Sequence, residues 1–306
     1  MPRALETAAL TALALTAFAF NSILTRMALG RGHLDAATFA AVRLVTGALA
    51  LALLVRGHAG SWTPLRGRGW AGPLALFVYA APFSFAYLRI GAATGALVLF
   101  GTVQLSMISW GVAHGERPGA RTWLGLLLAA GGLAALALPA ASRPDPLGTA
   151  LMVVAGVAWA SYSLQGKGAP DPLAANARGF LFSVPPALLM AGLAFRSWRV
   201  DGTGLLLASM SGAVTSGVGY AIWYRALRGL TAVRAAILQL AVPVIAAIAA
   251  VALLGETISA RLVGCGAVVL GGVGLALSGR ARPGSRPVTP TASTAGKVGQ
   301  PIVTER

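Results

Sequence analysis

One pattern occurs twice in this chain, as WGVAHGERPGARTWLGLLLAAGGLAAL at residues 110–136 and as AVALLGETISARLVGCGAVVLGGVGLA at residues 250–276. Each copy consists of an apolar run, a short Gly-Glu junction and a second apolar run that is rich in glycine. The matching positions are Gly115-Glu116 with Gly255-Glu256, Ala120-Arg121 with Ala260-Arg261, and Gly131-Gly132 with Gly271-Gly272. The chain therefore carries the same module twice.

The composition is that of a membrane protein. Hydrophobic residues make up 57% of the chain, charged residues only 10%, and the mean hydropathy is +0.76, whereas soluble domains contain about 25% charged residues. Apolar runs of about 17–25 residues recur along the chain, and each can cross a hydrocarbon core of roughly 30 Å as a helix. The sequence predicts an all-α integral membrane protein with about ten transmembrane helices. The expected spans are residues 4–24, 34–55, 70–90, 92–113, 121–140, 147–165, 173–195, 203–223, 231–254 and 262–278.

The repeat also predicts how these spans are organised. About five spans fall in each half, and an odd number makes the second copy enter the membrane from the opposite side, as in the inverted repeats of secondary transporters. We therefore expect two inverted five-helix repeats, at residues 1–140 and 141–278. Residues 279–306 are rich in Pro, Ser, Thr and Gly without apolar periodicity, which predicts a disordered cytoplasmic tail.

The formal net charge of +16 comes from basic residues that are scattered over short loops. This distribution argues against nucleic-acid binding and fits the positive-inside rule, by which cytoplasmic loops are rich in Lys and Arg. With ten spans and a cytoplasmic N-terminus, most of the 24 basic residues fall on the cytoplasmic side. We expect a multi-pass protein of the inner membrane with both termini in the cytoplasm. Its expected partners are a small-molecule solute, the lipid bilayer and a second copy of the chain in a homodimer.

No arrangement of residues typical of an enzyme is found in the sequence. It has no His/Cys/Asp/Glu cluster with metal-ligand spacing, no phosphate-binding Gly-Lys-Ser/Thr string and no nucleophile elbow. We therefore expect no catalytic residues, no metal and no cofactor. Glu116 and Glu256, at the two Gly-Glu junctions, suit helix ends, where they either stabilise the structure or take part in gating or ion coupling.

Several further motifs accompany the repeated junctions. They are the openings Phe18-Ala19-Phe20-Asn21-Ser22 and Trp159-Ala160-Ser161-Tyr162-Ser163, the run from Asp35 to Arg43 with its echo Asp171-Pro172-Leu173-Ala174, and Tyr224-Arg225-Ala226-Leu227 followed by Pro243. Together, over nearly all of residues 1–278, these features resemble the EamA family of the drug/metabolite transporter superfamily. The resemblance implies a ten-helix carrier with a central cavity, often an exporter of amino acids, metabolites or drug-like solutes. Near the place of Arg43, the second copy has Gly179.

Arg43 is the clearest charge within a predicted span, about nine residues into the second one. A charge at that depth costs at least ~2.5–3.5 kcal/mol unless it faces a wet cavity or a partner. Two interpretations stay open. Arg43 either contacts an anionic group from a cavity wall, or extends to the outer headgroups or caps a carbonyl.

Other polar and aromatic residues within the spans complete the candidate site. Asn21 and Ser22 match Tyr162 and Ser163 in the repeat, and equivalent polar pairs tend to face the central axis, although helix–helix hydrogen bonds are an alternative role. Buried amides need partners, and aromatic residues either line a cavity or form an interfacial belt. The predicted substrate-binding residues are Asn21, Ser22, Arg43, Tyr79, Gln104, Trp159, Tyr162, Ser163, Tyr220 and Gln239.

The hypothesis that follows is a secondary membrane transporter that exports small organic solutes, such as amino acids, metabolites or drug-like compounds, by alternating access. An aromatic and amide-rich cavity with few charges suits zwitterionic or apolar solutes better than polyanions. Two alternatives stay open at this point: a non-transporting membrane scaffold or sensor, and a membrane-embedded enzyme.

Overall fold

The computed structural model describes residues 3–62, 69–90, 92–137, 145–254 and 259–279, which are helical apart from short connections. Except for Gly279, the predicted tail lies outside these residues, as does Glu256. The helices are α1 Arg3–Gly30, α2 Ala36–Ala59, α3 Ala71–Ala86, α4 Ala92–Ala113, α5 Ala120–Ala137, α6 Pro146–Lys167, α7 Pro172–Leu193, η3 Phe195–Ser197, α8 Gly202–Met210, η4 Ser211–Val218, α9 Gly219–Leu227, α10 Ala232–Gln239, α11 Ala241–Leu254 and α12 Ala260–Ser278.

Within the described ranges, nine helical stretches are long and apolar enough to cross a membrane. Two of them are composite: Gly202–Leu227 combines α8, η4 and α9, and Ala232–Leu253 combines α10 with α11. The tenth apolar helix, α3, has 16 residues and ends before the predicted span 70–90 does, because the chain turns after Ala86. The prediction of an all-α membrane protein with about ten spans is confirmed.

Side-chain caps determine where several helices begin. In each case the residue before the helix accepts a hydrogen bond from a backbone N–H three residues later, which satisfies a group that the helix leaves unpaired. In α6 and α7 a proline follows the cap, at a position where its missing N–H costs nothing. The capping residues are Asp35, Asp145, Asp171, Asp201, Thr231 and Ser259.

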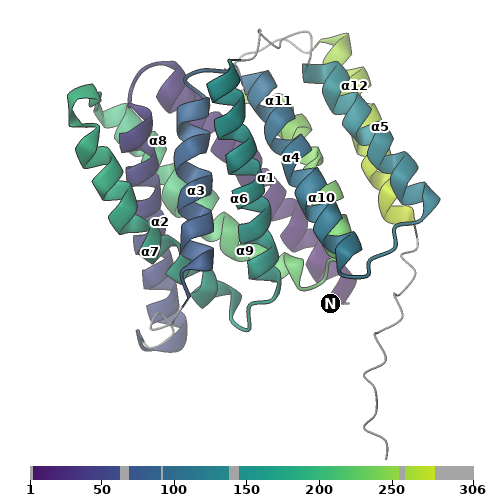
Figure 1. The fold of residues 1–306 in the computed structure, drawn as a ribbon, viewed down its shortest axis with the longest axis horizontal. Helices are drawn as coiled ribbons and strands as arrows, with labels where there is room; N and C mark the ends of the chain where they lie inside the picture. Colours follow the sequence, from purple (N-terminus) through teal and green to yellow (C-terminus); the bar gives the residue numbers. More distant parts are fainter. Residues whose placement is uncertain (1–2, 63–68, 91, 138–144, 255–258, 280–306) are drawn as a thin grey trace, which may run out of the picture.

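Helices from the two halves of the chain pack in pairs. α2 contacts α7, α4 contacts α10, and α5 contacts α12, the last pair forming one side of the bundle in Figure 1. Glycines bring the backbones of α5 and α12 together, since a Cβ on Gly125 would lie 2.5 Å from the carbonyl oxygen of Gly272. Each pair joins the second, fourth or fifth span of one half to its counterpart. The boundaries of the two repeats stay a prediction.

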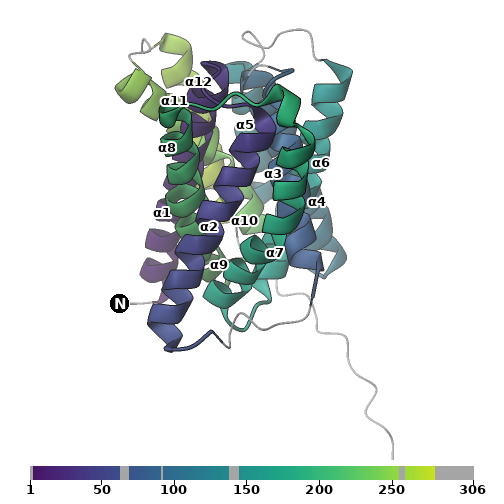
Figure 2. The ribbon, with the colours of Figure 1, turned by 90° about the vertical axis from the view of Figure 1, so that its left-hand side faces the viewer.

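The helices run along a common direction, so that their ends lie on two faces (Figure 2). One face, which we call the N-terminal face, holds the start of α1 and the end of α9, joined by an ion pair of 2.6 Å between Glu6 and Arg225. The other, the distal face, holds the start of α2 and the connection between α7 and α8, joined by a hydrogen bond of 3.1 Å from the Arg199 N–H to the Asp35 carboxylate. The cytoplasmic position of the N-terminal face and the homodimer stay predictions.

Candidate solute-binding site

A small cavity, which we call the central cavity, lies where α1, α3, α4, α6, α9, α10 and α11 meet. Its volume is about 30 Å³, which is room for roughly two water molecules. The wall is mainly aromatic, with a few hydroxyl and amide groups. Its residues are Phe18, Asn21, Ser22, Tyr79, Phe83, Leu99, Phe100, Trp159, Tyr220, Gln239 and Val242.

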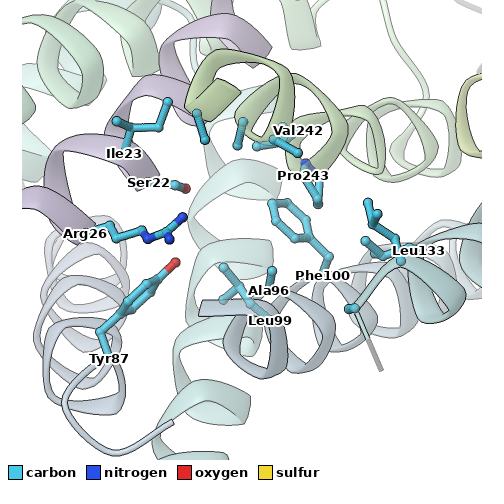
Figure 3. Close-up of a pocket in the computed structure, with 15 residues that line it drawn as sticks. Ser22, Ile23, Arg26, Tyr87, Ala96, Leu99, Phe100, Leu133, Val242 and Pro243 are labelled. Carbon is cyan, nitrogen blue, oxygen red and sulfur yellow. The ribbon is translucent and has the colours of Figure 1, made fainter. Parts of the chain in front are cut away.

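A larger cavity of about 200 Å³ adjoins the central one toward the distal face, and we call it the distal cavity. It lies between α1, the end of α3, α4, α5 and α11 (Figure 3). The two cavities share the wall residues Ser22, Leu99, Phe100 and Val242. The shared walls place the two cavities next to each other, between the middle of the bundle and the distal face.

Aromatic rings pack edge to face and tilted around the central cavity. The ring of Trp159 lies 5.2 Å from Phe18, 5.0 Å from Tyr79 and 4.7 Å from Tyr220, measured between ring centroids. The indole Nε1 of Trp159 donates to the Gln239 Oε1 at 2.6 Å, which fixes the orientation of the ring. Such pairs each contribute about 0.5–1.5 kcal/mol beyond the area they bury, so the wall is rigid.

Arg43 lies directly behind this wall. Its Nε donates to the hydroxyl of Ser216 at 2.8 Å, and its Nη2 donates to the hydroxyls of Tyr220 and, at 3.4 Å, Tyr79. The guanidinium carbon also lies 5.3 Å from the centroid of the Tyr79 ring, close enough for a cation–π interaction. Arg43 thus binds two tyrosines whose side chains line the central cavity.

Arg43 is a buried cation that remains partly unpaired. Its side chain is 1% exposed, and its Nη1 has no hydrogen-bond partner among the residues that the structure describes. Among the described residues, no carboxylate forms an ion pair with Arg43. The side chain points inward instead of extending to the headgroups, and an uncompensated buried charge is costly. Its role in transport stays a prediction.

Asn21 connects α1 to the eighth span through three hydroxyls. Its Oδ1 accepts from Ser211 at 2.7 Å, and from Thr215 and Ser216 at 3.4 Å each. These hydroxyls lie on η4, a π-helical stretch, which is a rare structure that occurs often at functional sites. Because Ser216 also accepts from Arg43, a single polar network joins Asn21, η4, Arg43 and the two tyrosines.

The structure brings most of the ten predicted residues together. Six line the central cavity, and Arg43 binds two of those six. The other three bind neighbouring helices and line neither cavity. Their hydrogen bonds run from Tyr162 Oη to Asn176 Oδ1 at 2.5 Å, from Trp223 Nε1 to Ser163 Oγ at 3.2 Å, and from Gln104 Nε2 to the carbonyl of Ala236 at 2.5 Å.

Sequence reasoning did not single out several residues that the structure places at the site. The apolar ones give no signal, because Leu99, Phe100 and Val242 look like any other residues of an apolar helix. The polar ones do give one: Ser211, Thr215 and Ser216 are spaced by four and five residues in an otherwise apolar span, as expected for one polar helix face. Arg26, which lines the distal cavity, lies just beyond the predicted first span at residues 4–24 and is not among the predicted site residues.

Comparison with known proteins agrees with this architecture. Residues 146–278 match the EamA-like transporter family. The uncharacterized protein PA1977 of Pseudomonas aeruginosa is 50% identical over 276 residues, which cover 90% of this chain and 96% of that protein. The uncharacterized transporter YwfM of Bacillus subtilis is 27% identical over 262 residues, covering 80% and 85% of the two chains.

A solved crystal structure also has the same fold, with a TM-score of 0.74 over 88% of this chain and 97% of the other. At 19% identity this likeness concerns the fold alone. Taken together with the sequence matches, the chain belongs to the EamA-like transporter family and is a multi-pass membrane transporter. The family named from the repeated motifs is thereby confirmed.

Proposed function

We propose that this chain is a secondary transporter that exports a small organic solute by alternating access, binding the solute across the distal and central cavities. The observation that carries the proposal is the pair of adjoining cavities, which lie between the aromatic wall and the distal face. Carriers built from repeated modules hold their solutes near the middle of the membrane. Alternating access then requires that the opposite side of the site be closed in this conformation.

Closure toward the N-terminal face is supported by the packing of α9. Trp223 follows Tyr220 by one helical turn toward that face, is fully buried and lies 5.6 Å from the Phe18 ring. The hydroxyl of Tyr224 donates to the carbonyl of Tyr162 at 2.9 Å, which joins α9 to α6. Opening on this side therefore requires α9 to separate from α1 and α6.

Glu116 adds a second contact at the N-terminal face, between α4 and α10. Its carboxylate accepts hydrogen bonds from the backbone N–H groups of Ala232 at 2.6 Å and Val233 at 3.0 Å, and so caps the N-terminus of α10. The cap joins the end of α4 to the start of α10 across the two halves of the chain. Under this proposal the same two hydrogen bonds give Glu116 both a structural role and a gating role.

The orientation of the two faces decides on which side of the membrane the distal cavity lies. The positive-inside rule places the N-terminal face in the cytoplasm, and the distal cavity then lies toward the outside. A reporter fused after Arg228 should be cytoplasmic and one fused after Arg199 external. The reverse result would overturn this orientation.

Counterflow into liposomes tests the transport itself. Purified protein in liposomes loaded with an unlabelled solute should accumulate the labelled solute, and Leu99→Ala, which alters the wall of both cavities, should change that rate. Leu105→Ala is the matched control on the same helix, because Leu105 is 73% exposed. A scaffold, a sensor or a membrane-embedded enzyme would show no counterflow for any solute. Increased growth tolerance on overexpression would identify an exported compound.

A further inference from the structure

A groove of about 520 Å³ opens near the N-terminal face. It lies between the first half of α1, the connection from α9 to α10, α10 itself and the end of α12, and we call it the α1–α10 groove. It shares no described wall residue with the central or the distal cavity. Its volume lies within the roughly 300–1,000 Å³ that is typical of ligand pockets. The groove is therefore a second candidate binding site, separate from the one for the solute.

One end of the α1–α10 groove is positively charged. Arg3 at the start of α1 and Arg234 in the first turn of α10 both line it, and its described wall contains no Asp or Glu. Among the described residues neither guanidinium is in an ion pair, whereas Arg225 on the same face pairs with Glu6 at 2.6 Å. The wall therefore offers two cationic groups to an anion.

Beyond the arginines the groove is apolar and follows α1 into the membrane. Its lining extends along α1 from Arg3 to Leu15, which is about 18 Å at the 1.5 Å rise of a helical residue. This length is close to the thickness of one leaflet, since the whole hydrocarbon core measures roughly 30 Å. Leu238, one turn after Arg234 on α10, and Leu277 near the end of α12 complete the apolar surface. The groove thus combines charge at one end with hydrocarbon contact over the depth of a leaflet.

The other polar side chains of the described wall are already bonded within α1. The hydroxyl of Thr7 donates to the carbonyl of Arg3 at 3.0 Å, and that of Thr11 donates to the carbonyl of Thr7 at 2.7 Å. The α9–α10 connection packs tightly on this wall, because an added Cβ on Gly229 would clash with the Thr7 hydroxyl. Among the described wall residues, the two guanidinium groups are therefore the side-chain donors left for a ligand.

We infer that the α1–α10 groove binds one anionic phospholipid, with its phosphate at Arg3 and Arg234 and an acyl chain along α1. Basic pockets between transmembrane helices suit acidic lipid headgroups. A soluble phosphate would leave the apolar part of the groove uncovered, and a zwitterionic lipid would bring its ammonium group toward two arginines. The inference requires that the chain lies in a membrane, and it does not rest on the proposed transport.

Competition between two lipids tests the charge of the ligand. The full chain in mild detergent is mixed with equal amounts of phosphatidylglycerol and phosphatidylcholine that carry identical acyl chains, and bound lipid is counted by native mass spectrometry. We expect phosphatidylglycerol to be bound in about 10-fold excess, because each arginine adds attraction for an anionic headgroup. Equal binding of the two lipids would overturn the inference. An excess of inorganic phosphate should not displace the lipid, and displacement would assign the groove to a soluble anion instead.

Charge variants locate the headgroup. The double variant Arg3→Gln/Arg234→Gln should lose most of the preference for phosphatidylglycerol. The matched control is Arg117→Gln/Arg121→Gln, which also removes two exposed positive charges but lies outside the groove, and it should keep the preference. An equal loss in both double variants would mean that the lipid responds to net charge alone, and the assigned contacts would be wrong.

Two neighbouring alanines of α1 test the contact with the acyl chain. Ala8 lines the groove and Ala9 does not, although both are exposed. Ala8→Phe fills part of the groove and should reduce bound phosphatidylglycerol several-fold, whereas Ala9→Phe should leave it unchanged. Because both positions are on the surface, the unfolding midpoints without added lipid should match that of the unmodified protein. Equal lipid binding by the two variants would contradict the groove as the site.

Discussion

Two corners of the molecule occupy matching places in the predicted repeat and are built from different side chains. In the corner formed by α1 and α2, a small amide, Asn21, is combined with the long side chain of Arg43. In the corner formed by α6 and α7, a large ring, Tyr162, is combined with Gly179, whose added Cβ would lie 2.8 Å from the Tyr162 hydroxyl. The first corner thus combines a small side chain with a long cation, and the second combines a large ring with a glycine.

Because the first corner holds Arg43 and the second holds Tyr162, the positive charge lies on one side of the site only. The hydroxyl of Tyr162 is bonded to Asn176, which in turn donates to the carbonyl of Gly217 at 2.9 Å, so the second corner is closed by internal hydrogen bonds. In the first corner, one donor of Arg43 has no partner among the described residues. A repeated backbone thus supports a symmetric framework around an asymmetric site, which is what binding one polar end of a solute requires.

The largest effect is expected from removing the charge of the first corner. Arg43→Gln should reduce counterflow about 10- to 100-fold, the loss expected for a hydrogen bond to a charged group, while the protein still inserts. Arg43→Lys should recover only part, because a single ammonium cannot reproduce the planar fork that contacts Ser216 and both tyrosines. Transport at the normal rate by the Gln variant would show that the guanidinium serves only packing.

Removing a polar group from the second corner should leave transport intact. Tyr162→Phe removes the hydrogen bond to Asn176, and interhelical hydrogen bonds in membranes contribute only about 0.6 kcal/mol on average. We expect a small decrease in the thermal unfolding midpoint and unchanged counterflow. Transport reduced as strongly as in Arg43→Gln would mean that both corners hold the solute, and the asymmetry would be wrong.

Glycine substitutions probe the packing of the same two corners. Gly212→Ala would place a Cβ against the backbone carbonyl of Arg43, which has little freedom to move, and should destabilise the protein by about 1–3 kcal/mol. Gly179→Ala meets the hydroxyl end of Tyr162 and should cost less, with part recovered by adding Tyr162→Phe. Gly131→Ala, with no atom within 4 Å of its Cβ, is the control. Thermal unfolding in detergent gives the ranking, and equal midpoints for the two corner variants would contradict it.

Thiol labelling compares the corners through a matched pair of serines. In a Cys265→Ser background, which removes the single native cysteine, Ser22→Cys should react with a small water-soluble reagent because Ser22 lines both cavities. Ser163→Cys should react slowly, since Ser163 is fully buried and accepts from Trp223. Bound solute should slow only the first reaction. Equal labelling rates would mean that both serine positions are equally accessible to water.

The sequence could predict the framework and part of the site. Apolar length and the repeated Gly-Glu junctions specify the spans, because crossing a bilayer imposes the same local requirement on every helix. The cost of burying polar groups identifies Asn21, Arg43 and Gln239 as inward-facing. Repeat equivalence then predicts that Tyr162 and Ser163 also face the site. The structure places both against neighbouring helices instead. Which of two equivalent polar residues faces a cavity depends on the volume of its neighbours from other helices, and this is not local information.

The smallest effect is expected at the distal face, where Asp201 joins α8 to the connection that follows α1. The Gly204 N–H and then the ring of His33, 2.6 Å away, stabilise the carboxylate and hold the pKa of Asp201 below its ordinary value. A lowered pKa in the folded state contributes stability above the unfolded pKa of about 3.9, and this contribution is lost as the pH falls through the lowered value.

Asp201→Asn keeps the cap, because an amide oxygen also accepts from the Gly204 N–H, and removes only the charge. The unfolding midpoint of the variant should therefore lie slightly below that of the unmodified protein at pH 6, and the two should converge below about pH 4. Because both Asp201 and His33 are partly exposed, the difference should be small and should shrink in high salt. Equal midpoints for the variant and the unmodified protein at pH 6 would contradict a stabilising charge on Asp201.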